Sequence, residues 1–316
     1  MKRFSLILTV FSAVAFAAGR CVAQQKVTVA YSAVSPIMAG VWMAKEIGAF
    51  EKYGLKADLV YISSGAITVQ AMVGGDLHMT VAASNAVISA ILHGAPLVAV
   101  GSVTNRPAMS LWVQPDITKP EQLQGKILAI TRAGSTTHFL TLAVLDKLGV
   151  RDKAKLQSFG GTIEADTAFR AGLVAGRVAS VKPAPQAHSL IDLPKLGIPF
   201  SMDFIAVKTD FNRTAPKTVE AMLKAYMEGV TALRLKDQAY RVLEKYLRRP
   251  AATLDEPYEY AVKYLEREPR VDPAVVQTVL DWESKPDVPV SKFFDNGIVD
   301  RLIKEGFVDN LVKGGR

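Results

Sequence analysis

Short runs rich in β-branched residues alternate with amphipathic helical stretches along most of this 316-residue chain. The first run covers 26–31, and a helical stretch at 36–53 follows it, opened by the capping residue Ser35 and ended by Gly54. A serine N-cap and a C-terminal glycine are typical of helix boundaries. Strands that alternate with helices favour mostly parallel sheets. The pattern therefore predicts an α/β fold.

The alternation indicates two lobes rather than one. Further strands are predicted at 56–62, 77–82 and 96–104, and a second series begins with strands at 126–130 and 155–159. A strand at 200–207 is predicted to return the chain to the first lobe. We expect lobe 1 to comprise residues 24–106 and 201–316, and lobe 2 residues 107–200.

Three stretches are predicted to be helical outside the first alternation. Residues 186–196 are expected to form a helix in lobe 2, and long charged helices are expected at 217–236 and 238–249. No Gly-rich or Ser-rich linker separates the last two from the chain before them. We therefore expect these charged helices to pack on lobe 1.

The first 23 residues have the composition of an export signal. Met1–Arg3 is basic, an apolar run covers Phe4–Ala18, and small residues precede Gln24. A membrane anchor is the alternative, but the run is shorter than the roughly 20 residues that span a bilayer. We expect cleavage near Ala23, a periplasmic location, and a mature chain that does not span the membrane.

The formal net charge of +8 raises the question of a polyanionic partner. The signal segment contains three basic residues and no acid, so 35 basic and 30 acidic residues remain and the net charge falls to +5. In the remaining chain, Lys and Arg are interspersed with Glu and Asp, as in 263–270. We therefore expect no nucleic-acid partner.

The only cysteine, Cys21, lies within the signal segment. It is a candidate for lipid modification, but Arg20 before it is a poor fit to the small residue that such a site requires, so we do not expect a lipid anchor. A mature chain without cysteine has no disulfide, no cysteine nucleophile and no thiolate metal site.

Common catalytic and nucleotide-binding motifs are missing from the sequence. It contains no Walker A loop, GxGxxG, HExxH or GxSxG pattern, and its four histidines include no pair at helical spacing. The sequence therefore predicts a protein that is not an enzyme and that holds no metal or cofactor.

Loops rich in Ser, Thr, Asn and Gly recur between a strand end and a helix start. Each helix start leaves free backbone N–H groups, and in open α/β sheets these ends gather at one crevice. One interpretation is that each hydroxyl is only a helix cap, worth about 1 kcal/mol. Since five loops are predicted to face one crevice, we favour a site for a small polar or anionic ligand.

Arg132 is the strongest candidate for pairing with an anion, because it directly follows a predicted strand; a solvated arginine is the alternative. The full set of candidate ligand-binding residues is Ser35, Met38, Ser63, Ser64, Gly65, Ser84, Asn85, Thr104, Arg132, Gly134, Ser135, Thr136, Thr137, Thr162, Asp166 and Lys182.

Four segments resemble a known family. They are Tyr31–Pro36, the GAFEKYGL run at 48–55, Gly74–Leu77 and Gly306–Asp309, and together they are similar to the nitrate/sulfonate/taurine group of ABC-transporter substrate-binding proteins. The resemblance implies a type II periplasmic-binding-protein fold, with two α/β lobes, two crossovers and a ligand cleft between the lobes. It also implies that a small organic ligand is delivered to an inner-membrane ABC permease by a monomeric protein.

The sequence departs from the family at Ala179–Lys182, where a small and an acidic residue are more usual. The resemblance therefore does not identify the part of the ligand that binds on that side of the cleft. The sequence leaves three alternatives to a transport receptor. An enzyme related to thiamine-pyrimidine synthases would share the fold, but those proteins carry a cysteine-rich motif. The others are a ligand sensor without a transport role and a surface protein that binds envelope polymers.

Overall fold

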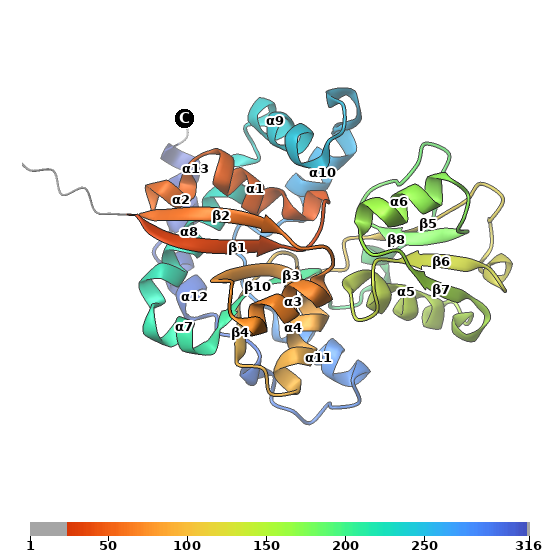
Figure 1. The fold of residues 1–316 in the computed structure, drawn as a ribbon, viewed down its shortest axis with the longest axis horizontal. Helices are drawn as coiled ribbons and strands as arrows, with labels where there is room; N and C mark the ends of the chain where they lie inside the picture. Colours follow the sequence, from red (N-terminus) through yellow and green to blue (C-terminus); the bar gives the residue numbers. More distant parts are fainter. Residues whose placement is uncertain (1–23, 315–316) are drawn as a thin grey trace, which may run out of the picture.

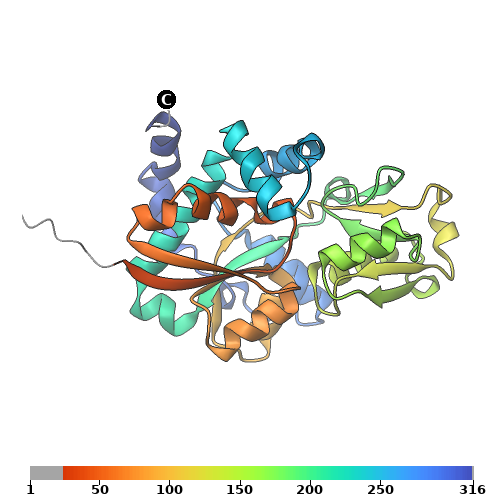
Figure 2. The ribbon, with the colours of Figure 1, turned by 45° about the horizontal axis from the view of Figure 1, so that its top comes forward.

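The computed structural model describes residues 24–314. The predicted signal peptide and Cys21 lie outside the described residues. Two lobes lie side by side, each with its own five-stranded sheet (Figures 1 and 2). Among the described residues, no helix has the length and apolar character needed to cross a bilayer.

The sheet of lobe 1 has the order β2-β1-β3-β10-β4. Its strands are β1 (Gln25–Tyr31), β2 (Leu55–Tyr61), β3 (Met79–Ala83), β4 (Leu97–Ser102) and β10 (Asp203–Lys208). β1 pairs in parallel with β2 and β3, whereas β10 is antiparallel to both β3 and β4. β10 is antiparallel to these strands because the chain enters it from lobe 2, at the end of the sheet where β1 and β3 finish.

The sheet of lobe 2 repeats this arrangement in the order β7-β6-β8-β5-β9. Its strands are β5 (Ser110–Val113), β6 (Ile127–Ile130), β7 (Lys155–Ser158), β8 (Gly176–Ala179) and β9 (His188–Asp192). β6 is parallel to β7 and β8, and β5 is antiparallel to β8 and β9. The predicted two-lobed α/β class is confirmed, with mixed sheets in which half of the strand pairings are parallel.

Helices flank both sheets. Lobe 1 carries α1 (Ala39–Glu46), α2 (Ala49–Lys52), α3 (Gly65–Gly74), α4 (Ser84–Leu92), α7 (Thr209–Thr214), α8 (Pro216–Ala232), α9 (Lys236–Leu247), α10 (Asp255–Tyr264), α11 (Pro273–Trp282), α12 (Gly297–Lys304) and α13 (Phe307–Gly314). Lobe 2 carries α5 (Thr136–Lys147) and α6 (Thr162–Arg170), which lie on opposite sides of its sheet (Figure 1).

Two predictions of secondary structure were wrong. The helix expected at 186–196 is instead strand β9 followed by a 3₁₀ turn at Leu193–Leu196. A short apolar run is ambiguous between the two states, and pairing with β5 decides in favour of the strand. The helix expected at 36–53 is divided into a 3₁₀ turn, α1 and α2, and the break between α1 and α2 occurs where Gly48 adopts a left-handed conformation with φ of 70°.

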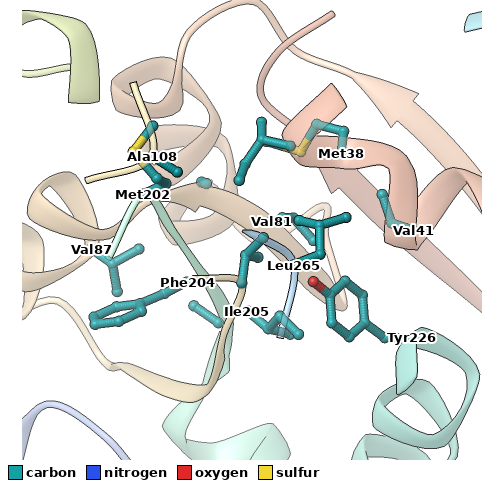
Figure 3. Packing of buried hydrophobic residues seen from close by; sticks show 14 of the residues in the cluster. Met38, Val41, Val81, Val87, Ala108, Met202, Phe204, Ile205, Tyr226 and Leu265 are labelled. Atoms are coloured by element: carbon teal, nitrogen blue, oxygen red, sulfur yellow. The ribbon is translucent and has the colours of Figure 1, made fainter. Parts of the chain in front are cut away.

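The main hydrophobic cluster extends through both lobes, and in lobe 1 side chains from β3, β10, α1, α4 and α8 meet in it (Figure 3). The helices α1 and α8 approach each other closely because Gly40 and Gly229 face one another. A Cβ atom at Gly229 would collide with the backbone oxygen of Gly40. This tight core supports the sheet edge that faces lobe 2.

Candidate functional site

A cavity of about 460 Å³ lies between the two lobes. Lobe 1 contributes residues 32–37, Ser64, Gly65 and Asp203, and lobe 2 contributes Thr131, residues 135–137 and the start of α6. The end of α9 adds Leu247, Arg248 and Arg249. The lining is therefore drawn from segments more than 200 residues apart in the chain.

Three helices begin at the cavity: α3 at Gly65, α5 at Thr136 and α6 at Thr162. The first turn of an α-helix has N–H groups without intrahelical partners, and its N-terminus carries a partial positive charge. Three such ends around one cavity favour a ligand with an anionic group. Of the five loops that the sequence predicted at one crevice, four contribute residues to this lining, whereas Ser84 and Asn85 are not part of it.

Ser64 is the N-cap residue of α3 and is 4% exposed. Its N–H donates to the Ser32 carbonyl at 3.1 Å, but its hydroxyl has no hydrogen-bond partner among the described residues. Its φ of 77° is rare for a residue with a side chain. A buried, unpartnered hydroxyl on strained backbone at a cavity wall is suited to binding a ligand atom.

An ion pair joins α6 to strand β8 beneath the cavity. Arg177 Nη1 lies 2.8 Å from Asp166 Oδ1 and also donates to the Thr162 carbonyl at 3.0 Å. Arg177 is only 2% exposed, so this pair is buried. Arg249 Nη2 approaches the other Asp166 oxygen at 3.7 Å. Two arginines therefore neutralise the Asp166 carboxylate. Asp166 lines the cavity, as predicted, and its ion pair with Arg177 also joins α6 to β8.

The cavity lining contains more basic than acidic side chains. Four arginines line it. Arg177 and Arg249 are paired with Asp166, whereas Arg170 and Arg248 are exposed and make no ion pair within residues 24–314. The acids are Asp166 and Asp203. Arg248 ends α9 in a left-handed conformation with φ of 53°. The excess of guanidinium groups adds to the positive potential of the helix N-termini.

Asp203 is the second acid and lies at the start of β10. It is 5% exposed, and its Oδ1 accepts a hydrogen bond from Ser32 Oγ at 3.3 Å. Burial raises the pKa of its carboxyl to about 7, against the smaller opposite effect of the Ser32 hydrogen bond. A carboxyl in this environment changes its charge near neutral pH.

Half of the predicted binding residues line the cavity, and half do not. Those in the lining are Ser35, Ser64, Gly65, Ser135, Thr136, Thr137, Thr162 and Asp166. Those outside it are Met38, Ser63, Ser84, Asn85, Thr104, Arg132, Gly134 and Lys182. Residues of both groups also bind partners within the protein.

Several predicted residues outside the lining have structural partners instead. Met38 is buried in the core, Ser84 donates to the Ser201 carbonyl, and Thr104 donates to the Arg106 carbonyl. Lys182 Nζ donates to the Pro185 carbonyl at 3.1 Å, and Arg132 is exposed. Arg132 is the strongest candidate in the sequence for pairing with an anion, but it is not in the cavity lining. The arginines in the lining are Arg170, Arg177, Arg248 and Arg249.

Five hydrogen bonds that involve side chains connect the lobes within residues 24–314, and one of them runs from the Lys182 N–H to Glu256 Oε1 at 2.8 Å. Ser35 Oγ donates to Ser180 Oγ at 3.3 Å and Ser63 Oγ to the Gly160 carbonyl at 2.6 Å. The other two run from Asn85 Nδ2 to the Gly134 carbonyl and from Thr136 Oγ1 to the Met202 carbonyl, each at 2.9 Å. Several predicted loops thus hold the lobes together, and Ser35 and Thr136 do so while they also line the cavity.

Ser135 combines a cavity position with helix capping. Its hydroxyl accepts from the His138 N–H at 3.3 Å and donates to the Arg132 carbonyl at 2.7 Å. Ser135 is therefore a helix cap that also lines the cavity, and its role in ligand binding stays a prediction.

Sequence reasoning missed Asp203, Arg177, Arg248 and Arg249. A signal existed for Asp203, because a charged residue inside the predicted apolar strand at 200–207 is unusual and calls for a buried partner or a ligand. For the two arginines after α9 there was none, since they lie far from every predicted loop in the chain.

Two α/β lobes with mixed sheets and a ligand-sized cavity between them define the class of two-lobed binding proteins. Within that class, the chain belongs to the NMT1/THI5-like family, whose sequence model matches residues 35–238. No curated protein gives a significant sequence match. The predicted family resemblance is confirmed.

Solved structures with this fold include a protein from Bordetella bronchiseptica RB50, with a TM-score of 0.79 at 19% identity over 89% of this chain and 98% of that chain. The alkanesulfonate-binding protein SsuA from Xanthomonas axonopodis pv. citri, bound to MOPS, matches with a TM-score of 0.71 at 19% identity over 84% and 94%. The periplasmic nitrate-binding protein NrtA from Synechocystis PCC 6803 gives 0.71 at 12% identity over 89% of each chain. The likeness establishes the periplasmic-binding-protein fold.

A DszB mutant in complex with biphenyl-2-sulfinic acid also shares the fold, with a TM-score of 0.60 at 16% identity over 89% of this chain and 99% of that chain. This likeness, too, shows the fold alone.

Proposed function

We propose that this protein is the solute-binding component of an ABC importer and captures a small organic ligand, a sulfonate, a carboxylate or a heteroaromatic compound, between its lobes. The observation that carries the proposal is the cavity between the lobes, at which three helix N-termini and four arginines converge. Family membership supports it, as do the names of the sulfonate-binding and nitrate-binding neighbours.

The proposal includes a location and a partner. The basic and apolar composition of residues 1–23 supports export to the periplasm, where a monomeric receptor would release its ligand to an inner-membrane permease. The lobes would be residues 24–106 with 201–316, and residues 107–200, which places each crossover beside the cavity. Closure of the lobes around the ligand would mark the form that the permease accepts.

We propose capture without chemical conversion. The sole cysteine of the sequence is Cys21, and the cavity lining within the described part of the chain includes no histidine. Nor do residues 24–314 place three His, Cys, Asp or Glu side chains where they could hold a metal ion. These facts support binding over catalysis, because a nucleophile with an adjacent base is the usual requirement for covalent chemistry.

A ligand screen tests the proposal. The purified protein is heated with individual sulfonates, carboxylates and heteroaromatic acids, and calorimetry then measures the affinity of each compound that raises the melting temperature. A ligand at 100 times its Kd adds about 2.7 kcal/mol to the free energy of unfolding. We expect at least one tight ligand that mass spectrometry recovers unchanged. Its conversion by the pure protein would overturn the receptor assignment.

A further inference from the structure

A turn at residues 248–256 joins α9 to α10 and touches lobe 2. α9 ends at Leu247, where Arg248 adopts a left-handed conformation with φ of 53°, and the helix cannot continue through the nearby Pro250. Figure 1 shows α10 on the side of lobe 1 that faces lobe 2. Both crossovers between the lobes precede this turn in the chain, so the turn is not needed to connect the lobes covalently.

Both helices that flank the turn are fixed to lobe 1. The Tyr246 ring of α9 stacks on Trp42 of α1, with ring centroids 4.9 Å apart and an angle of 10° between the planes. The Tyr246 hydroxyl donates to Glu46 Oε1 at 2.8 Å, and Lys245 Nζ lies 2.8 Å from the same oxygen. On α10, Tyr260 is buried in the main hydrophobic cluster. The turn should therefore move with lobe 1 when the lobes separate.

Two side chains of the turn contact different elements of lobe 2. Glu256 Oε1 accepts a hydrogen bond from the Lys182 N–H, in the loop after β8, at 2.8 Å. Arg249 Nη2 lies 3.7 Å from Asp166 Oδ2 on α6. Asp166 has a closer partner in Arg177, at 2.8 Å within lobe 2, so the contact with Arg249 is an addition between the lobes.

The strength of these contacts suits a conformational equilibrium. Neither Glu256 nor Lys182 belongs to the cavity lining, so their hydrogen bond does not depend on a solute. Glu256 is exposed and Arg249 is partly exposed, and contacts of this kind shift an equilibrium by about fivefold or less. Such a bias changes the populations of an open and a closed form and still lets them interconvert.

We propose that residues 248–256 form a latch that holds lobe 2 against lobe 1 in the absence of a solute. Glu256 and Arg249 are the two holding groups, and together they set the fraction of the ligand-free protein in which the lobes are closed. The latch goes beyond solute capture, because it gives control of the lobe equilibrium to a segment outside both sheets and both crossovers.

Pulsed EPR distance measurement tests the latch without any ligand. The predicted mature chain has no cysteine, so spin labels attach only at Asp58→Cys on β2 and Leu173→Cys in lobe 2, both of them exposed positions. The distance distribution of this labelled protein is compared with that after Glu256→Ala or Arg249→Met is added. We expect each variant to raise the ratio of open to closed protein about threefold to fivefold, and the double variant to raise it further.

Two controls separate the latch from a general effect on α10. Glu256→Gln keeps an oxygen that accepts from the Lys182 N–H and should preserve the distribution, as should Glu259→Ala, which removes an exposed carboxylate from the same helix. Identical distributions in the labelled protein, Glu256→Ala and Arg249→Met would overturn the latch, and so would an equal shift in Glu259→Ala. Since no ligand is present, either result leaves the proposed function in place, and a failed ligand screen leaves the latch in place.

Discussion

Ser63 and Ser64 are neighbours in the sequence but have different environments. The Ser63 hydroxyl donates across the cleft to the Gly160 carbonyl, whereas the Ser64 hydroxyl is buried at the cavity without a partner in the described part of the protein. One hydroxyl is therefore already used in the ligand-free protein, and the other is free to bind.

This contrast predicts different effects of alanine at the two positions. Ser64→Ala removes no hydrogen bond of the ligand-free protein, so its melting temperature should not fall, but ligand affinity should drop about fivefold, as for the loss of a hydrogen bond worth about 1 kcal/mol. Ser63→Ala should lower the melting temperature of the ligand-free protein instead. Thermal denaturation and calorimetry check both; wild-type affinity in Ser64→Ala would remove this hydroxyl from the site.

At the scale of elements, lobe 2 depends on the buried pair that joins β8 to α6. Arg177→Met leaves Asp166 buried with only Arg249 at 3.7 Å, so we expect a loss of about 3–5 kcal/mol in the free energy of unfolding. The control Arg213→Met breaks the exposed pair with Asp210 and should cost less than about 1 kcal/mol.

Denaturant unfolding measures the two losses. The double variant Arg177→Met with Asp166→Asn should recover part of the stability, because the buried charge is then removed together with its partner. Equal losses in Arg177→Met and in the exposed control would show that the pair does not hold these two elements together.

At the scale of the whole molecule, the two lobes lie within hydrogen-bond distance of each other. Ser35 Oγ and Ser180 Oγ are 3.3 Å apart on opposite sides of the cleft. The double variant Ser35→Cys with Ser180→Cys should form a disulfide in this closed arrangement, which would slow ligand association by about 10-fold or more because the cleft must open to admit the ligand. Reductant should restore the wild-type rate.

Stopped-flow association kinetics provide the measurement, with the single variant Ser35→Cys as the control for the loss of the hydroxyl. Equal association rates in the oxidised and reduced double variant would mean that the ligand enters without separation of these two residues.

Much of the architecture could be predicted because its signals are local. The alternation of strands and helices, the caps and the helix starts at Gly65, Thr136 and Thr162 depend on residues a few positions apart. These signals predicted the α/β class, the two lobes and a crevice at which helix N-termini converge. They failed at 186–196, where a strand formed because β5 offered it a partner.

The sequence by itself determined which segments form strands and helices and which loops offer backbone N–H groups, since periodicity and capping are properties of short segments. Only the tertiary structure decided that Asp203, Arg177 and Arg249 surround one cavity while Arg132 and Lys182 lie outside its lining. Those neighbours come from β10, β8 and the end of α9, and their meeting depends on which sheet pairings and helix contacts bury the most apolar surface. That balance is a property of the whole chain, and no short segment records it.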